Sequence, residues 1–312
     1  MHQEPILKNL DAHDVRIPTG RVPLVSIGLP LYNAEKYLTV ALDALLAQTF
    51  TDFELIISDN ASTDRTDEIC RKYAARDARI RYVRNEKNFG AVANYNRTVE
   101  LARGKYFRWA TYDDLVAPEL LERCVEVLEK EDDVVMCYPK TIDIDEQGNV
   151  LGNYEDNFEF TAEEPQDRFR DLMKVVGDYD CNAEYGVMRR EVLLKTGMEQ
   201  SYHSADKVLL SELVLHGKFR EVPERLFYHR HHASTTTVQG WTGAQFLQFL
   251  DTSKKGKFAF PRLRRFVEFI RSINRSNIPI RKRIPCYGQV ILFYLEPERW
   301  KRLLGLSKPT AG

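Results

Sequence analysis

The fold is decided by residues 23–64, which read PLVSIGLPLYNAEKYLTVALDALLAQTFTDFELIISDNASTD. Residues 23–29 predict a buried strand, and residues 53–58 predict a second, short strand. Between the two strands, apolar residues recur with the period of an α-helix at positions 34, 37/38, 41/42 and 45/46. Asn33 is suited to cap this helix, and Glu35 would lie in its first turn, where the helix dipole favours a negative charge.

The same alternation continues along the chain. Further helices are predicted at 64–73 and 89–102 and further strands at 80–83, 106–110 and 134–138, while Pro118 opens a fourth helix. Strands separated by single helices require right-handed crossovers. We therefore predict an α/β protein with an open, mostly parallel sheet covered by helices on both faces.

The second half of the chain is organised differently. Residues 141–180 are more polar, with a hairpin turn at 145–149 and a short helix at 169–175, and a second α/β passage follows with a helix at 206–216 and extended segments at 219–222 and 226–231. After residue 243 the pattern is helical and basic. We predict a lead at 1–21, a catalytic domain at 22–240 whose halves are 22–140 and 141–240, and a basic helical C-terminal region at 241–312.

Composition narrows the class of protein. With 43% hydrophobic and 29% charged residues, the 312-residue chain is typical of a globular protein. The five cysteines form no C-x-x-C pair, which favours reduced core cysteines. The longest charge-free apolar stretch, residues 284–295, has 12 residues, whereas a bilayer span needs about 20. No secretory signal is visible, so we expect a cytoplasmic, soluble chain.

Polar residues follow three of the predicted strands, at 30–33, 59–64 and 111–114. The carboxyl ends of parallel strands share one edge of a sheet, where ligands bind in such folds. None of the three segments is a glycine-rich phosphate loop, which argues against dinucleotide and P-loop proteins. The adjacent carboxylates of Asp113 and Asp114 suit Mg²⁺ or Mn²⁺ bound together with substrate phosphates. Alternatively, they cap the helix that begins at Pro118.

Five successive segments resemble the signatures of family 2 glycosyltransferases. They are PLYN at 30–33, IISDNASTD at 56–64, NFG at 88–90 with Asn94, GKYF at 104–107, and TYDDLVAP at 111–118. The resemblance covers roughly residues 22–235. It implies a GT-A fold, a nucleotide-diphosphosugar donor that is UDP- or dTDP-linked, a divalent cation (Mn²⁺ or Mg²⁺) and an inverting mechanism.

The resemblance also assigns roles to residues. Those expected to bind or border the donor are Pro30, Tyr32, Asn33, Glu35, Asp59, Asn60, Asn88, Asn94, Thr111 and Asp113. Asp113 would be the main metal ligand, with Asp114 next. Two positions depart from the family pattern, because Asn60 stands where many relatives have a second Asp and Thr111 replaces an acidic residue. Asp59 has an alternative role in an Asx-turn or as a helix cap.

Asp206 matches the family position of the general base that deprotonates the acceptor hydroxyl. Its alternative role is a helix N-cap, which Asp also serves well. Further on, His231 falls where relatives place a histidine near the metal or diphosphate, with His232 as the second choice. Surface histidines remain an alternative, and zinc binding is disfavoured because no third ligand is near in the sequence.

Charge divides the chain unevenly. Residues 251–312 contain 15 Lys/Arg against 4 Asp/Glu, although the whole chain has a formal net charge of −1. An amphipathic basic helix at 262–275 suits an anionic membrane, so we expect peripheral contact with the inner face of a membrane through residues 251–312. Alternatively, these helices pack on the catalytic domain and leave their arginines in water. The expected acceptor is a glycan or a lipid-linked molecule in cell-surface glycan synthesis, and nucleic acid is not expected. The competing functions are a catalytically silent nucleotide-sugar-binding module and a sugar nucleotidyltransferase.

Overall fold

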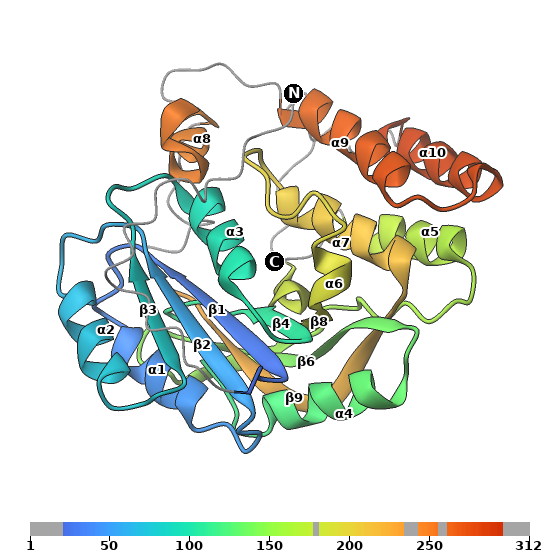
Figure 1. The fold of residues 1–312 in the computed structure, drawn as a ribbon. Coiled ribbons are helices and arrows are strands. Elements are labelled where there is room, and N and C mark those ends of the chain that lie inside the picture. The colour runs from blue at the N-terminus through green and yellow to red at the C-terminus, as the bar shows by residue number, and fades with distance from the viewer. Residues whose placement is uncertain (1–20, 177–180, 234–242, 255–260, 296–312) are drawn as a thin grey trace.

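The computed structural model describes residues 21–176, 181–233, 243–254 and 261–295 (Figure 1). The strands are β1 (Val25–Leu31), β2 (Phe53–Asp59), β3 (Ile80–Arg84), β4 (Tyr106–Trp109), β5 (Leu115–Val116), β6 (Val134–Ile144), β7 (Val150–Tyr154), β8 (Val187–Arg189) and β9 (Lys218–Arg230). The α-helices are α1 (Leu38–Leu46), α2 (Thr66–Ala74), α3 (Ala91–Leu101), α4 (Leu120–Lys130), α5 (Pro165–Val175), α6 (Arg190–Leu193), α7 (Ala205–His216), α8 (Gly243–Leu250), α9 (Pro261–Arg275) and α10 (Ile280–Leu295). Two 3₁₀ turns, η2 (Asn182–Tyr185) and η3 (Thr252–Lys254), complete the description.

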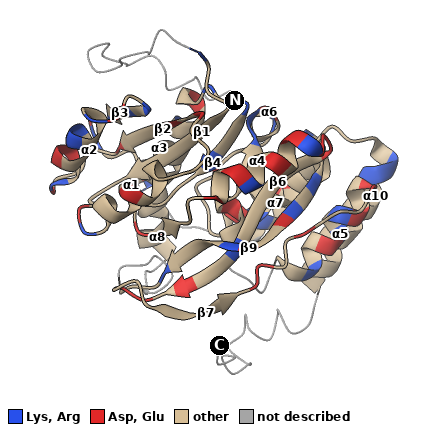
Figure 2. Ribbon diagram, turned by 90° about the horizontal axis from the view of Figure 1, so that it is seen from below, with Lys and Arg blue, Asp and Glu red and all other residues tan. Residues whose placement is uncertain are grey.

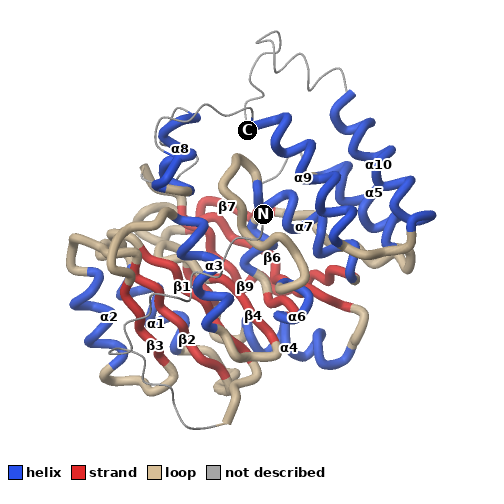
Figure 3. The backbone as a smooth tube through the Cα atoms, turned by 45° about the horizontal axis from the view of Figure 1, so that its top comes forward, coloured by secondary structure: helices blue, strands red, loops and turns tan. Residues whose placement is uncertain are grey.

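One sheet runs through the molecule in the order β3-β2-β1-β4-β8-β6-β9-β5, and β7 pairs with β6. The strands from β3 to β4 are parallel, as the alternation of strand and helix predicts. Antiparallel pairings enter through β8, β5 and β7, whereas β6 and β9 are parallel to each other. The strands from β3 to β4 therefore end at one common edge, whereas the rest of the sheet mixes parallel and antiparallel pairs. Figure 3 shows this sheet with the helices around it.

Helices cover both faces of the sheet, so two apolar cores form. One core lies between the sheet and the helices α1, α2 and α4, where Leu42, Cys70 and Cys124 are buried. The other contains residues of α3, α5, α7, α9 and α10. Helix α3 packs directly on β1, since a Cβ atom at Gly28 would lie 2.4 Å from Thr98 Oγ1. This close approach brings the start of α3 to the edge at which β1 ends.

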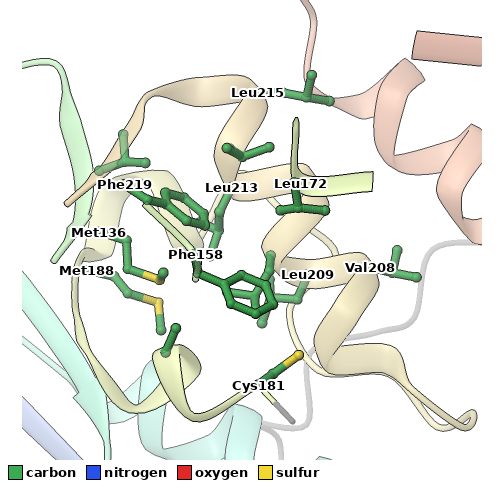
Figure 4. Packing of buried hydrophobic residues seen from close by; sticks show 14 of the residues in the cluster. Met136, Phe158, Leu172, Cys181, Met188, Val208, Leu209, Leu213, Leu215 and Phe219 are labelled. Carbon is green, nitrogen blue, oxygen red and sulfur yellow. The ribbon is translucent and has the colours of Figure 1, made fainter. Parts of the chain in front are cut away.

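The C-terminal helices are part of the second core. Phe269 and Ile273 of α9 and Val290 of α10 are fully or almost fully buried in it. Figure 4 shows the neighbouring part of this core, in which Met136 of β6 and Met188 of β8 lie near Phe158 and Phe219. The described part of the predicted C-terminal region therefore packs on the sheet-bearing body, while the predicted boundary near 240 and most of the lead at 1–21 lie outside the described residues.

Several boundaries differ from the sequence prediction. Helix α1 begins at Leu38 rather than near Ala34, because Asn33 has a left-handed backbone (φ 52°) that ends β1 in a turn. Asn33 is therefore not its N-cap, and Glu35 is not in its first turn. Helix α4 begins at Leu120, two residues after Pro118. The extended segments at 219–222 and 226–231 join into β9, whose pairing with β6 runs almost its whole length.

The prediction of reduced cysteines is confirmed, since all five are buried and free. Among the described residues, no helix is both long enough and apolar enough to cross a membrane.

Candidate donor and metal site

The loops that follow β1 and β2 are joined to each other at the ligand edge. Asn33 Oδ1 accepts a hydrogen bond from Thr63 N at 2.8 Å, and Asn33 N donates to Ser62 Oγ at 2.9 Å. Glu35 Oε2 accepts from Arg65 N at 3.0 Å, in the residue that precedes α2. Asn33 and Glu35 thus hold the two loops together. Pro30 is buried in β1, and the neighbouring Tyr32 is 45% exposed.

The asparagines of this edge form a buried network instead of an open lining. Asn94 donates to Leu31 O and Ser58 O and accepts from Ser58 Oγ, which ties α3 to the ends of β1 and β2. Asn60 donates to Asn88 Oδ1 at 2.9 Å and accepts from Phe89 N. Both Asn60 and Asn94 are at most 3% exposed. In this structure both asparagines support the edge from within, and the half-buried Asn88 belongs to the same network. Their contact with the donor stays a prediction.

Asp59 is also fully buried. Its Oδ1 accepts from Ser62 N at 2.8 Å, and its Oδ2 accepts from Tyr82 OH at 2.9 Å and Arg84 Nη1 at 3.1 Å. The bond to Ser62 is that of an Asx-turn, the alternative that the sequence left open. Both carboxylate oxygens are thus engaged by the protein, so in this structure Asp59 shapes the loop instead of presenting itself to a nucleobase.

The two adjacent aspartates after β4 have different surroundings. Asp114 is 7% exposed, and its carboxylate accepts from Thr111 Oγ1 at 2.5 Å and from Arg230 N at 2.8 Å. His229 Nδ1 lies 3.2 Å from the same carboxylate. The Asp114 side chain is 6% exposed, against 18% for Asp113, so Asp113 is the more accessible carboxylate, and the metal role of Asp114 stays a prediction. Thr111, in place of the family's acidic residue, fixes Asp114.

Asp113 is the aspartate that remains available. Its side chain is 18% exposed, and Oδ2 lies 2.9 Å from Nε2 of His232, whose side chain is 2% exposed. Burial raises the pKa of Asp113, and the charge of Asp114 adds to this rise, whereas the contact with His232 opposes it. A positive charge placed at Asp113 would therefore be favourable.

His232, and not His231, is the histidine at this position. His231 Nε2 lies 3.0 Å from Asp143 Oδ1, and its side chain is 46% exposed. Strand β9 ends at Arg230, and His231 N still donates to Ile144 O of β6. The ring centres of His229 and His231 lie 4.9 Å apart, whereas His232 lies beside Asp113. The structure thus brings His232, the second choice, next to Asp113, and the role expected of His231 stays a prediction.

Arg230 fixes this corner of the site, and the sequence analysis did not single it out. Its Nε donates to Asp113 O at 2.7 Å, and its Nη1 donates to Asp145 O and Glu146 O at 3.0 Å. Its guanidinium carbon lies 5.0 Å from the ring centre of Tyr37, and the His232 ring lies 5.1 Å from the same ring. Arg230 thus joins the aspartate loop, the β6–β7 turn and the start of α1.

A second arginine lies behind the aspartate loop. Arg108 of β4 is fully buried, and neither Nη1 nor Nη2 has a hydrogen-bond partner, although Nε donates to Tyr185 O at 3.1 Å. Burial lowers its pKa to about 10, and the charges of Cys124 and Asp114 partly oppose this. Arg108, Thr111 and Asp114 line a cavity of about 10 Å³. The guanidinium provides a positive charge beneath Asp114.

The residues present fit a divalent cation supplied with its substrate. Among the described residues, no group of three or more His, Cys, Asp or Glu side chains could hold a metal ion. Mg²⁺ commonly binds through only one or two carboxylates plus substrate phosphates. Neighbouring ligands of an octahedral ion lie about 3 Å apart when each metal–ligand bond is about 2.1 Å. The 2.9 Å between Asp113 Oδ2 and His232 Nε2, which is a hydrogen bond in this structure, is close to that spacing.

The predicted base lies on a separate element. Asp206 is in the first turn of α7, but the N-cap is Ser204, and no side-chain hydrogen bond caps the helix. The alternative role of Asp206 as the N-cap is therefore not seen. The side chain is half-buried and hydrogen-bonds to the Cys181 thiol.

Two glutamates accompany Asp206. Burial raises the pKa of Glu184 and of Glu199, the latter to about 7, and the charge of Glu199 adds to the rise at Glu184. The charge of Asp206 raises the pKa of both groups further. The sequence analysis did not single out either glutamate. No local motif distinguishes Glu184 or Glu199 from a surface glutamate.

Two half-buried tyrosines, Tyr95 and Tyr185, pack against the second core. Burial raises the pKa of Tyr95, and the charges of both Glu184 and Asp113 add to this rise. Burial also raises the pKa of Tyr185, to which the same two charges contribute. Asp113 and Glu184 therefore both act electrostatically on this tyrosine pair.

The arrangement defines a class of protein: an α/β protein with a GT-A-type sheet and a carboxylate–histidine pair at the ligand edge. The fold is similar to that of TarS residues 1–349 from S. aureus in complex with UDP-GlcNAc, with a TM-score of 0.57 and 16% identity over 86% of this chain and 81% of that one. It is also similar to the mannosyltransferase PcManGT from Pyrobaculum calidifontis in complex with GDP-Man and Mn²⁺, with a TM-score of 0.51 and 16% identity over 92% of this chain and 85% of that one.

Comparison of the sequence with known proteins identifies the family. The profile of Glycosyl transferase family 2 matches residues 26–197, which is more than half of the 312 residues, and the chain belongs to that family. It is 36% identical over 134 residues to an uncharacterised glycosyltransferase of Methanocaldococcus jannaschii, covering 42% of this chain and 46% of that protein. It is 37% identical over 133 residues to chondroitin synthase of Escherichia coli, covering 43% of this chain and 19% of that protein. The chain thus spans less than half the length of these two relatives.

Proposed function

We propose that this chain transfers a sugar from a nucleotide-diphosphosugar to an acceptor hydroxyl, as an inverting, metal-assisted glycosyltransferase. The observation that carries the proposal is the pair formed by Asp113 and His232 at the edge where β1, β2 and β4 end. Membership of the family supports it, as do the nucleotide sugars named for the two similar structures. We propose a UDP- or dTDP-linked donor.

The donor would lie over the loops that follow β1 and β2. Tyr32 offers a half-exposed ring to the nucleoside, and Pro30 and Asn33 border it. Asp113 and His232 would hold a divalent cation, Mn²⁺ or Mg²⁺, which would neutralise the negative charge of the diphosphate leaving group. Asp114, Thr111 and Arg230 would keep the Asp113 loop in place, because their hydrogen bonds already fix it.

Asp206 would act as the general base. It would take the proton of the acceptor hydroxyl while the acceptor oxygen bonds to the anomeric carbon and the bond from that carbon to the diphosphate breaks. One displacement of this kind inverts the configuration and releases a nucleoside diphosphate. The half-buried carboxylate is not used as a helix cap, which supports this role.

The acceptor would be a glycan or a lipid-linked molecule in polysaccharide, glycolipid or other cell-surface glycan synthesis. We further propose a cytoplasmic location with peripheral contact with the inner face of a membrane. A silent binding module would bind a donor without turnover. A sugar nucleotidyltransferase would require a basic, glycine-rich loop after the first strand, which residues 30–33 do not provide.

The test measures nucleoside diphosphate release from a panel of nucleotide sugars with Mn²⁺, Mg²⁺ or EDTA, with and without acceptor glycans. We expect metal-dependent release from one donor and a loss of about 10²-fold or more in Asp206→Asn. Glu163→Gln, which changes an exposed carboxylate before α5, is the matched control and should keep full activity. Donor binding without release from any donor and acceptor combination would instead favour the silent module.

A further inference from the structure

Helix α10 has two apolar faces, and the described residues cover only one of them. Cys286, Val290 and Phe293 point into the core and are at most 7% exposed. Phe293 lies 6.1 Å from Phe269 of α9, ring centre to ring centre, and Lys282 forms an ion pair of 2.7 Å with Glu164 beside α5. One side of α10 is therefore firmly packed on the body of the molecule.

The other side carries a row of large apolar side chains in water, which we name the α10 stripe. Its members are Ile280, Ile284, Ile291, Leu292 and Leu295, which are 48–64% exposed. Spacings of four, seven and eleven residues return to the same side of an α-helix, since each residue turns the helix by about 100°. The stripe therefore forms one continuous face opposite the packed one. A contiguous exposed apolar face of this kind is typical of an interaction site.

The charge of α10 indicates what the stripe meets. Arg281, Lys282 and Arg283 cluster at the start of the helix, and residues 280–295 include no Asp or Glu (Figure 2). Arg283 donates to the carbonyl oxygen of Ile278, and this contact does not neutralise the charge of its guanidinium. An apolar face with cations beside it is the pattern of helices that lie in the surface of anionic membranes.

Other occupants fit less well. A second copy would present the same patch across a two-fold interface, so it would bring further basic residues and no acidic surface. The segment 296–312 that follows α10 contains four Lys/Arg and two Glu, so it is also basic overall. An anionic lipid surface both covers the apolar stripe and neutralises the cations.

We propose that the α10 stripe, together with the exposed Arg281, is a membrane-docking face for anionic phospholipid, whereas Lys282 and Arg283 are engaged with Glu164 and the Ile278 carbonyl. Helix α9 is joined by packing to α7, the helix that carries Asp206, through Arg275 and Glu212. Docking through α10 would therefore hold the body that carries the predicted base at the lipid surface. The inference deepens the proposed function, because it fits a lipid-linked acceptor.

The experiment is co-sedimentation of the full chain with vesicles of phosphatidylcholine alone or of phosphatidylcholine mixed with phosphatidylserine. Wild-type protein should bind the mixed vesicles more tightly than vesicles of phosphatidylcholine alone, by at least about fivefold for each basic residue that contacts the lipid. The double variant Ile284→Asp/Leu292→Asp should lose at least about tenfold in binding, since each change removes an apolar side chain from the lipid and adds a charge. The matched control is Val40→Asp/Val150→Asp, which changes two side chains of similar exposure, 53% and 65%, on α1 and β7.

Three results would overturn the proposal: no binding of the wild type to the mixed vesicles, an equal loss in the control, or unchanged binding in the stripe variant. A dimer in solution that the stripe variant abolishes would identify a second copy as the occupant instead. Binding of a nucleotide-sugar donor in the absence of vesicles should be the same in all three proteins. A failure of donor binding in all of them would count against the proposed function and not against the docking face.

Discussion

Replacing Asp114 with alanine should destabilise the protein, whereas replacing Asp113 with asparagine should not. Asp114→Ala removes the acceptor of the part-buried Thr111 hydroxyl and of the buried Arg230 amide, and it removes the carboxylate beside the His229 ring. A buried donor left without an acceptor costs about 1 kcal/mol or more. We therefore expect the free energy of unfolding to fall by about 3 kcal/mol.

Asp113→Asn should behave in the opposite way. Burial and the charge of Asp114 raise the pKa of Asp113, so the folded protein is less favourable with this carboxyl ionised. The raised pKa means that the stability this group contributes at low pH is lost as the pH rises through its folded-state pKa. At neutral pH, asparagine removes that penalty, so Asp113→Asn should unfold at the same temperature as the wild type or higher.

The assay is thermal unfolding at pH 7 without added metal, followed by circular dichroism. For a chain of 312 residues, about 3 kcal/mol corresponds to a fall of roughly 5 °C in Tm for Asp114→Ala. Equal Tm values for Asp114→Ala and the wild type would refute the structural role of Asp114. A large fall in Asp113→Asn would show that Asp113 is also structural, and the distinction between the two aspartates would then be lost.

Three further predictions concern other parts of the molecule. Burial raises the pKa of Asp156 to about 7. The free energy of unfolding of the wild type should therefore fall as the pH rises from 4 to 7, by at most about 4 kcal/mol from this group. Asp156→Asn should remove that fall, which urea titrations at several pH values would measure. His232→Ala should raise the Mn²⁺ concentration for half-maximal activity about tenfold or more, whereas His231→Ala should leave it unchanged; the reverse order would contradict the geometry. Arg275→Met should lower the free energy of unfolding by about 3–5 kcal/mol in urea, because Glu212, 1% exposed, loses its cation, and no change would show that α9 is not part of the core.

The parallel half of the sheet can be predicted from the sequence because the hydrophobic periodicity and the polar residues that end each strand agree there. Apolar runs separated by helical periods define β1 to β4 without any long-range information, and the polar residues after each strand locate the ligand edge. The predicted C-terminal helices also form. What the sequence did not supply is the antiparallel insertion of β8 between β4 and β6, because a three-residue strand has almost no periodic signal.

The site was predicted as a set of positions but not as contacts. Asp59, Asn60 and Asn94 lie at the expected edge, but their polar atoms form hydrogen bonds with other protein groups. These bonds depend on distances between loops, which the sequence patterns do not predict. The choice between His231 and His232 depended on which ring lies beside Asp113. That contact joins residues 119 positions apart in the chain, so no local pattern predicts it.

The central claim is that Asp113 and His232 hold a divalent cation together with the donor diphosphate. Isothermal titration of nucleoside diphosphate into the protein with Mn²⁺ tests it most directly, using the nucleotide of the donor that the panel identifies. We predict that Asp113→Asn lowers the affinity at least about tenfold in Mn²⁺, and that the wild type loses a similar amount in EDTA. Equal affinity of the wild type and Asp113→Asn in Mn²⁺ would contradict the account.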